Sequence, residues 1–351
     1  MKKRFYIING SHGATYIFNI SSYNLIKQSL KFYKPTNVIN LFKSWIVFFY
    51  LNFLRLFPKS LLNSKLYNNS EINEYIKNFK KINIDLKLND NSSALISPNN
   101  DKIVVNNNGK FFSKYAFNQS YIKVKNELNN YNFLKQNKIN NFHIPKISNI
   151  EDNLVDKISF NIFNEIVIKK YNQSIKKGLI EIFNSLKNNK KEVQINVYAH
   201  ELEKELESND IKMENINLYL ENIRTIYGNR KISLGFVHGD FKKSNLEIKD
   251  NQIILFDFEE ATLTGLPLFD YFNFIIDPLI LKNNPSQVVK KIFSANNTSY
   301  YQKYLSQLKE SIDFRIFLSL YIIKRIISYK IWNRNRYLNG YIALFEEINN
   351  E

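Results

Sequence analysis

The sequence of 351 residues contains no cysteine. This absence excludes disulfides, thiolate-ligated zinc, iron–sulfur clusters and cysteine nucleophiles, and it suits a reducing cytoplasm. Glycine and proline are also scarce, with nine and seven residues. Because flexible linkers are rich in glycine and stiff linkers are rich in proline, we expect any domains of this chain to be tightly connected.

A long hydrophobic run is also absent from the sequence. The most apolar stretch, Trp45–Phe57, is interrupted by Asn52 and Arg55 and is shorter than the roughly 20 residues that a membrane-spanning helix needs. The basic start of the chain is followed by too short an apolar stretch for a secretory signal. We therefore expect a cytoplasmic protein. Trp45–Phe57, with Lys43, Arg55 and Lys59, forms either a buried helix or an interfacial helix on an anionic membrane.

Positive charge is the clearest bias of the composition. Lys and Arg number 49 against 32 Asp and Glu, which gives a formal net charge of +17. Such a surplus fits binding to nucleic acid, an anionic membrane or a phosphorylated ligand, but Lys, Asn and Ile recur throughout the chain, so compositional drift is the alternative. No zinc-finger or RNA-recognition signature is present, so no specific nucleic-acid partner is expected.

The hydrophobic content of 44% and the length predict a folded chain of about two domains. Residues 1–85 alternate short aromatic strands with helical stretches and carry no recognisable chemistry, so we interpret them as an N-terminal extension packed on the smaller of two lobes. Residues 86–172 are predicted to form this smaller lobe, and residues 173–351 the larger one.

The smaller lobe begins with a sheet. Three antiparallel strands are predicted at Ala94–Ser97, Lys102–Asn106 and Lys110–Phe117, because turn residues separate them. Apolar residues at helical spacing then predict a helix over Ile122–Gln136. A further strand is predicted at Glu165–Lys169.

The larger lobe is mainly helical with a β-rich insert. A strand is predicted at Ser233–Val237, and a hairpin at Leu246–Lys249 and Ile253–Asp257. A helix over Asp313–Trp332, apolar on one face and basic on the other, is expected to close the chain.

The residues that carry chemistry surround this hairpin. Asp240 lies in the loop after the Ser233–Val237 strand, Asn245 ends that loop, and Asp257 ends the hairpin twelve residues later. The hairpin should return Asp257 to the side of Asn245. Carboxylate and amide oxygens suit Mg²⁺, and a phosphate group would complete the coordination of such an ion. The pattern therefore indicates phosphoryl transfer.

The same residues form two halves of a known signature. His238-Gly239-Asp240 with Asn245, followed by Asp257-Phe258-Glu259, match H-G-D-x-x-x-x-N and D-F/W-E in order and spacing. On these residues the sequence resembles the aminoglycoside phosphotransferase and choline kinase family, over about residues 93–345. The resemblance implies an α+β, two-lobed, protein-kinase-like fold, with a small antiparallel-sheet N-lobe and a mainly helical C-lobe. It also implies Asp240 as catalytic base and Asn245 and Asp257 as magnesium ligands; the alternative is a turn with a structural Asp and Asn.

The resemblance further implies a lysine on the third strand that binds the nucleotide phosphates and pairs with a glutamate on the next helix. Lys114 and Glu127 stand at these positions. The alternative is that Glu127 forms a surface i,i+4 pair with Lys123. By the same resemblance, Glu165–Lys169 would be the hinge strand that receives adenine.

Several neighbours of the motif are interpreted as supporting residues. His238 would stabilise the loop, Gly239 would allow close approach to phosphate, and Asp270 would support the loop from below. Glu259 would contact metal or substrate. Lys242 would meet the transferred phosphate, which is a departure from the antibiotic kinases and matches the protein kinases.

The expected function is transfer of the γ-phosphate of ATP, or alternatively GTP, to a hydroxyl of a small molecule with Mg²⁺ as cofactor. The basic composition favours a sugar or a glycolipid head group as acceptor. Residues 97–101, the turn expected to cover the nucleotide, contain no glycine, which keeps a catalytically weak pseudokinase open as an alternative. A nucleic-acid-binding protein is the further alternative.

Overall fold

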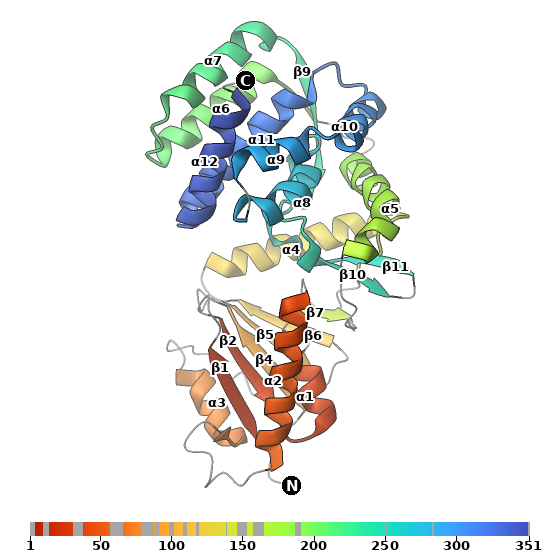
Figure 1. The fold of residues 1–351 in the computed structure, drawn as a ribbon, viewed down its shortest axis with the longest axis vertical. Helices are drawn as coiled ribbons and strands as arrows, with labels where there is room; N and C mark the ends of the chain where they lie inside the picture. Colours follow the sequence, from red (N-terminus) through yellow and green to blue (C-terminus); the bar gives the residue numbers. More distant parts are fainter. Residues whose placement is uncertain are drawn as a thin grey trace. The chain divides into compact units, whose positions relative to one another are not determined.

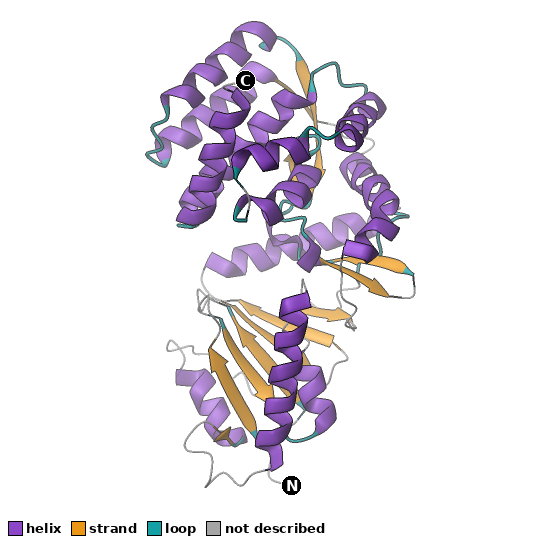
Figure 2. Cartoon of the chain, viewed as in Figure 1, coloured by secondary structure: helices purple, strands orange, loops and turns teal. Residues whose placement is uncertain are grey.

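A computed structural model describes residues 4–9, 14–30, 38–56, 66–78, 88, 91–97, 102–107, 111–116, 119–137, 139–145, 153–156, 165–186, 191–249, 251–282 and 284–349. The chain divides into two compact units. A sheet unit comprises residues 1–136, 142–172 and 243–259, and a helical unit comprises residues 137–141, 173–242 and 260–351. The fold class is thus α+β, as the sequence predicts (Figure 2).

The sheet unit is built on a seven-stranded antiparallel sheet with the order β3-β1-β2-β4-β5-β6-β7. Its strands are β1 (Phe5–Asn9), β2 (Thr15–Asn19), β3 (Leu66–Tyr67), β4 (Ser92–Ile96), β5 (Lys102–Asn107), β6 (Phe111–Ala116) and β7 (Asn153–Asp156). The three strands predicted for the smaller lobe correspond to β4, β5 and β6. The N-terminal segment contributes β1, β2 and β3, so it forms part of the same sheet.

Helices cover both faces of this sheet. They are α1 (Tyr23–Ser29), α2 (Val38–Leu56), α3 (Asn69–Asn78) and α4 (Gln119–Gln136). Neighbouring strand residues point to opposite faces. Tyr6 and Phe18 therefore pack with residues of α1 and α2, whereas Phe5 and Ile17 pack with residues of α3 (Figure 1).

A hairpin of β10 (Leu246–Lys249) and β11 (Gln252–Leu255) also belongs to the sheet unit. Leu246 pairs with Leu255, and the N–H of Phe256 donates to the carbonyl oxygen of Asn245 at 3.2 Å. The hairpin therefore brings the chain back to Asn245 one residue before Asp257, as the sequence predicts.

The helical unit surrounds a small sheet of order β12-β9-β8. Its strands are β8 (Lys191–Gln194), β9 (Lys231–Val237) and β12 (Thr262–Gly265). Its helices are α6 (Ile195–Ser208), α7 (Glu214–Tyr227), α8 (Phe269–Ile280), α9 (Pro285–Ile292), α10 (Ala295–Leu308), α11 (Phe314–Ile331) and α12 (Asn335–Asn349), together with most of α5 (Glu165–Phe183). A short 3-10 turn lies at Asn184–Leu186 in this unit. Two more lie at Lys243–Asn245 and Phe258–Glu260, at the two ends of the segment 243–259 that belongs to the sheet unit.

Two predicted elements are wrong. Glu165–Lys169 is not a strand but the first part of α5. Its β-branched residues suggested a strand, but the helix is set by later residues, Ile175, Leu179 and Ile182, which recur at helical spacing and are buried. In the sheet, β6 pairs with β5 on one side and with β7, rather than with residues 165–169, on the other.

The helix predicted at Asp313–Trp332 does not close the chain. It corresponds to α11, whose N-terminus is capped by the Asp313 side chain, and α12 follows it. Residues on most sides of α11 are buried, so it is a core helix rather than a helix with one basic face. Among the described residues, no helix is long and apolar enough to cross a bilayer.

Candidate active site

The ammonium group of Lys114 is the centre of a charge cluster in the sheet unit. Its Nζ donates to both carboxylate oxygens of Glu127 at 2.7 and 2.8 Å, to Asp257 at 2.9 Å and to Glu259 at 3.1 Å. Lys102 also pairs with Glu259. Lys114 and Glu127 are thus brought together as expected, and the second half of the motif is joined to them.

The secondary structure explains why these side chains meet. Lys114 stands on β6 opposite Val104 of β5, while Glu127 lies on the buried side of α4, with only 2% of its surface exposed. Asp257 and Glu259 follow directly after β11. The neighbouring elements β6 and α4, together with the segment after β11, which is distant in sequence from both, therefore each contribute charged groups to one cluster.

Side chains of α4 hold the backbone of the segment that carries Asp257 and Glu259. The N–H of Asp257 donates to the Tyr131 hydroxyl at 3.2 Å, and the side-chain amides of Asn130 and Asn126 donate to the carbonyl oxygens of Phe258 and Glu259, each at 3.2 Å. Asp257 itself has a φ of 72°. This left-handed conformation is uncommon for a residue other than glycine, and such residues concentrate at functional sites.

Burial and charge shape the protonation of this cluster. Burial raises the pKa of Glu127 to about 7, against the opposing effect of the Lys114 ammonium, and the carboxylates of Asp257 and Glu259 add to the rise. Burial alone would lower the pKa of Lys114, but the neighbouring carboxylates raise that pKa well above its ordinary value. Lys114 is therefore a permanent cation at physiological pH.

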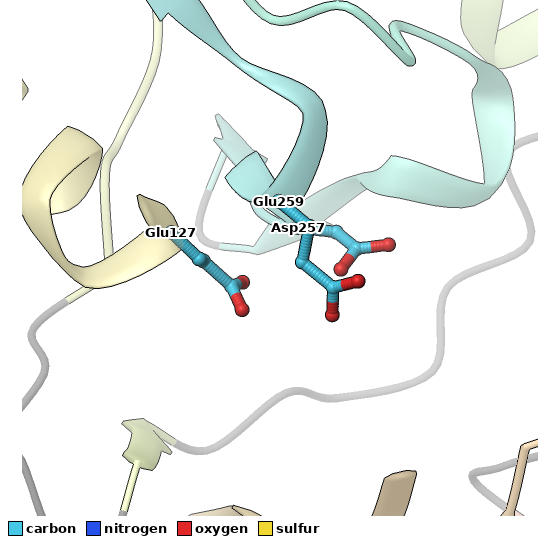
Figure 3. A group of neighbouring side chains, drawn as sticks. All are labelled: Glu127, Asp257 and Glu259. Carbon is cyan, nitrogen blue, oxygen red and sulfur yellow. The ribbon is translucent and has the colours of Figure 1, made fainter. Parts of the chain in front are cut away.

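The three carboxylates also form a candidate metal site (Figure 3). Glu127, Asp257 and Glu259 each offer an oxygen, and these oxygens lie within 4.8 Å of one another. Since only hard oxygen donors are present, the set fits Mg²⁺ better than a softer metal. Both carboxylate oxygens of Glu127 accept hydrogen bonds from Lys114, whereas the lysine contacts of Asp257 and Glu259 each use one oxygen, so Asp257 and Glu259 are the better placed ligands.

The motif residues before Lys243 lie in the helical unit, in the loop after β9. The N–H groups of His238 and Gly239 donate to the two oxygens of Asp270, at 2.7 and 3.0 Å. Burial raises the pKa of Asp270, although these N–H groups and the neighbouring His238 side chain oppose the rise. Asp270 lies at the start of α8 and thus ties the loop to that helix.

Gly239 meets a steric requirement in this loop. Its φ is 79°, and a Cβ atom there would lie 2.2 Å from the carbonyl oxygen of Glu260. Only glycine fits this position without movement of the backbone. The loop conformation thus depends on the residue type that the motif specifies.

Asp240 is the partly exposed residue of the loop. Its N–H donates to Nδ1 of His238 at 3.3 Å, and its carboxylate pairs with Lys242 at 2.5 Å. The imidazole of His238 is fully buried. His238 therefore acts on the loop backbone, whereas the Asp240 and Lys242 side chains are 23% and 39% exposed to solvent.

A buried polar network supports the loop from the helices. Arg325 of α11 donates to the carbonyl oxygen of Gly239 at 3.5 Å and pairs with Asp277 of α8 at 3.1 Å. Asp277 also accepts hydrogen bonds from the hydroxyls of Tyr329 and Tyr341. The side-chain amide of Asn273 donates to the carbonyl oxygen of Phe241 at 3.2 Å.

The expected site residues thus fall into two sets. Lys114, Glu127, Asp257 and Glu259 form one cluster in the sheet unit, which also holds Asn245; the helical unit holds His238, Gly239, Asp240, Lys242 and Asp270. Sequence reasoning missed Lys102, Tyr131 and Arg325. Lys102 could have been suspected as the first residue after the expected covering turn, whose residues 98–101 lie outside the described residues.

Comparison with known proteins found solved structures that are similar to this chain. No family model and no curated protein matches the sequence. An ADP-bound aminoglycoside phosphotransferase is 17% identical, with 80% of this chain and 99% of that chain covered and a TM-score of 0.45. A choline kinase from Cryptosporidium parvum is 14% identical, with 71% and 85% covered and a TM-score of 0.43. A glucosamine kinase is 10% identical, with 70% and 75% covered and a TM-score of 0.43.

These similar structures are small-molecule kinases. They are proteins of the kind that the motif resembles. At such identities and TM-scores, what this chain does has to be argued from its own residues.

Proposed function

We propose that this protein is a small-molecule kinase that transfers the γ-phosphate of ATP, or of GTP, to a hydroxyl group. The observation that carries the proposal is the Lys114 ammonium held by Glu127, Asp257 and Glu259 at 2.7 to 3.1 Å. A lysine held by a helix glutamate, next to an acid at the end of a strand, is the arrangement by which kinases bind phosphates and metal.

In this proposal, the sheet unit binds the nucleotide. Lys114 contacts the α- and β-phosphates, and Glu127 keeps the ammonium group in place. Asp257, Asn245 and Glu259 are the residues that would hold Mg²⁺, which neutralises charge on the phosphate oxygens when bound. The cluster has three carboxylates and two lysines, Lys102 and Lys114, so when Glu127 is ionised it has a net negative charge that favours a cation.

The helical unit supplies the groups for the transfer itself. Asp240 orients the acceptor hydroxyl and accepts its proton, so that the oxygen attacks the γ-phosphorus while the bond to the leaving diphosphate breaks. Lys242 stabilises the charge of the transferred group. In the structure Lys242 pairs with Asp240, and this ion pair restrains the positions of both side chains.

The acceptor is proposed to be a sugar or a glycolipid head group. The support is the chain's formal charge of +17, which favours neutral or anionic acceptors over cationic ones such as aminoglycosides.

A nucleotide-consumption screen tests the proposal. Purified full-length protein is incubated with Mg²⁺ and ATP or GTP, and with sugars, lipid-linked sugars, amino alcohols, nucleosides or aminoglycosides. We expect consumption to accelerate with one acceptor class and to stop in EDTA. A phosphorylated acceptor, identified by mass spectrometry, would establish the reaction.

Two results would contradict the proposal. Nucleotide binding without consumption for any acceptor would indicate a pseudokinase, and absence of Mg²⁺-dependent nucleotide binding would remove the kinase assignment altogether. A clear preference for aminoglycosides would overturn the acceptor class and leave the kinase assignment intact.

A further inference from the structure

Helix α2 has a second apolar face, directed away from the core. Its inner face packs Leu51 and Leu54 with Tyr6 and Phe18 of the sheet. The outer face recurs at spacings of three and four residues and holds side chains that are between 46% and 73% exposed: Phe42, Trp45, Ile46, Phe49, Tyr50, Phe53 and Leu56. Of the outer face, Tyr50 also reaches the sheet, where its hydroxyl lies 3.2 Å from the hydroxyl of Tyr6.

The outer face is a continuous patch rather than scattered exposure. Half of the large exposed hydrophobic side chains among the described residues lie on this one helix. Two of the rings also contact each other, since the centroids of Trp45 and Phe49 are 5.9 Å apart. Exposed patches of this kind mark protein or membrane contact sites.

The charge of the sequence before and after α2 indicates what kind of partner its outer face would contact. The first acidic residue of the chain is Glu71, although the average composition would place about six acids in 70 residues. The basic residues before it are Lys2, Lys3, Arg4, Lys27, Lys31, Lys34, Lys43, Arg55, Lys59 and Lys65. Compositional drift accounts for frequent lysine, but it does not account for the complete absence of acids here.

We propose that α2 lies flat on an anionic lipid surface. Its outer aromatic and aliphatic side chains enter the boundary between head groups and acyl chains, where Trp and Tyr are favoured, and basic residues such as the exposed Lys43 of α2 contact lipid phosphates. A second copy of this chain fits less well, because two segments with ten basic residues and no acid would repel one another. The proposal is independent of the kinase activity.

Vesicle sedimentation with the full-length protein tests the proposal. We expect binding to phosphatidylglycerol-rich vesicles, at least about tenfold weaker binding to pure phosphatidylcholine vesicles, and a loss of binding as salt rises. The variant Phe42→Ser/Phe49→Ser/Phe53→Ser should lose at least about tenfold in affinity for the anionic vesicles, because three of the inserted side chains become polar.

A matched control replaces three exposed apolar residues elsewhere. Val197→Ser/Leu218→Ser/Ile226→Ser changes side chains that are 44%, 53% and 66% exposed on α6 and α7. This control should bind anionic vesicles like the wild type. Circular dichroism of both triple variants verifies that they fold, and equal binding by the two variants would overturn the proposal.

Trp45 reports the depth of insertion. Trp45 and Trp332 are the two tryptophans of the chain, and Trp45 lies on the outer face of α2. Anionic vesicles should shift the emission of the wild type to shorter wavelength, whereas Trp45→Phe should bind with similar affinity and lose the shift. A concentration-dependent dimer that the α2 serine variant abolishes, without vesicle binding by the wild type, would assign the face to a second copy instead.

Discussion

The two units hold their candidate site residues by different physical means. In the sheet unit, Lys114, Glu127, Asp257 and Glu259 hold one another through charge, and each side chain is part of the candidate site. In the helical unit, the backbone of the Asp240 loop is held by buried side chains, chiefly Asp270, which leave the Asp240 carboxylate accessible.

This difference separates the consequences of mutation. A charge cluster responds to protonation and to the loss of any one charge, so changes there should alter nucleotide binding and its pH dependence. A loop held by buried polar groups responds to loss of packing and of hydrogen bonds, so changes beneath it should alter stability first. Substitutions in each region test whether effects on nucleotide binding can be separated from effects on stability in this way.

The largest effect is expected beneath the loop of the helical unit. Arg325→Ala leaves Asp277 without its buried cationic partner, in a pair whose side chains are 3% and 11% exposed. Loss of one partner of such a pair costs about 3 to 5 kcal/mol of unfolding free energy. Urea unfolding followed by circular dichroism measures the change.

The adjacent residue provides the control. Lys324 pairs with Glu205, but these side chains are 35% and 41% exposed, so Lys324→Ala should cost less than about 1 kcal/mol. Equal losses in the two variants would show that the Arg325 network does not stabilise the helical unit.

The second prediction separates chemistry from binding. Asp240→Asn should reduce phosphoryl transfer by roughly two to three orders of magnitude and leave nucleotide affinity nearly unchanged, because the carboxylate acts on the acceptor hydroxyl. Steady-state kinetics and nucleotide titration measure the two quantities. Asp210→Asn is a matched control, since Asp210 also pairs with a lysine two residues later but is 83% exposed. Wild-type turnover of Asp240→Asn would remove the base assignment.

The third prediction concerns the metal. Asp257→Asn removes one anionic ligand of a hard-cation site, so Mg²⁺-dependent nucleotide affinity should fall by about tenfold or more. Isothermal titration with and without Mg²⁺ measures this effect. The two proteins should become similar in EDTA, where no divalent metal is bound. The same affinity for Mg-ATP in wild type and variant would exclude Asp257 as a ligand.

The smallest expected effect is a change of pH profile. The pKa of Glu127 is raised by burial to about 7 from its ordinary 4.5. The pair with Lys114 is complete only when Glu127 is ionised, so kcat/KM for ATP should rise as pH increases through about 7. Nucleotide-bound Mg²⁺ favours the ionised form, so the corresponding rise in kcat should occur at lower pH. The variant Glu127→Gln should be less active and should lack this dependence.

The effect of Glu127 on stability has the opposite sign. Since its pKa is higher in the folded protein than in the unfolded chain, the folded state holds the proton more tightly. This contribution to stability is fully present below about pH 4.5 and is lost as pH rises towards about 7. Stability curves of wild type and Glu127→Gln should therefore differ most in slope between these pH values, and parallel curves would contradict the raised pKa.

Local sequence predicted the elements around the site well. Turn residues separated β4, β5 and β6, and the short turn before β11 identified the hairpin that returns the chain beside Asn245. The strand predicted at Glu165–Lys169 was wrong because a short apolar run fits either a strand or a buried helix. Whether such a run pairs with a neighbouring strand or packs as a helix depends on distant residues, which the local sequence does not identify.

Local patterns in the amino-acid chain limit the chemistry that this protein can perform. Absence of cysteine excludes thiol chemistry, and the spacing of Asp240, Asn245 and Asp257 predicts oxygen ligands for a metal, because these patterns are local in the chain. Other features depend on the folded chain: Lys102 joins Lys114 at Glu259, the Tyr131 hydroxyl accepts the Asp257 N–H, and β1 to β3 extend the sheet. Contacts between distant residues form because burial and charge pairing are optimised over the whole fold, and no local pattern records the partner.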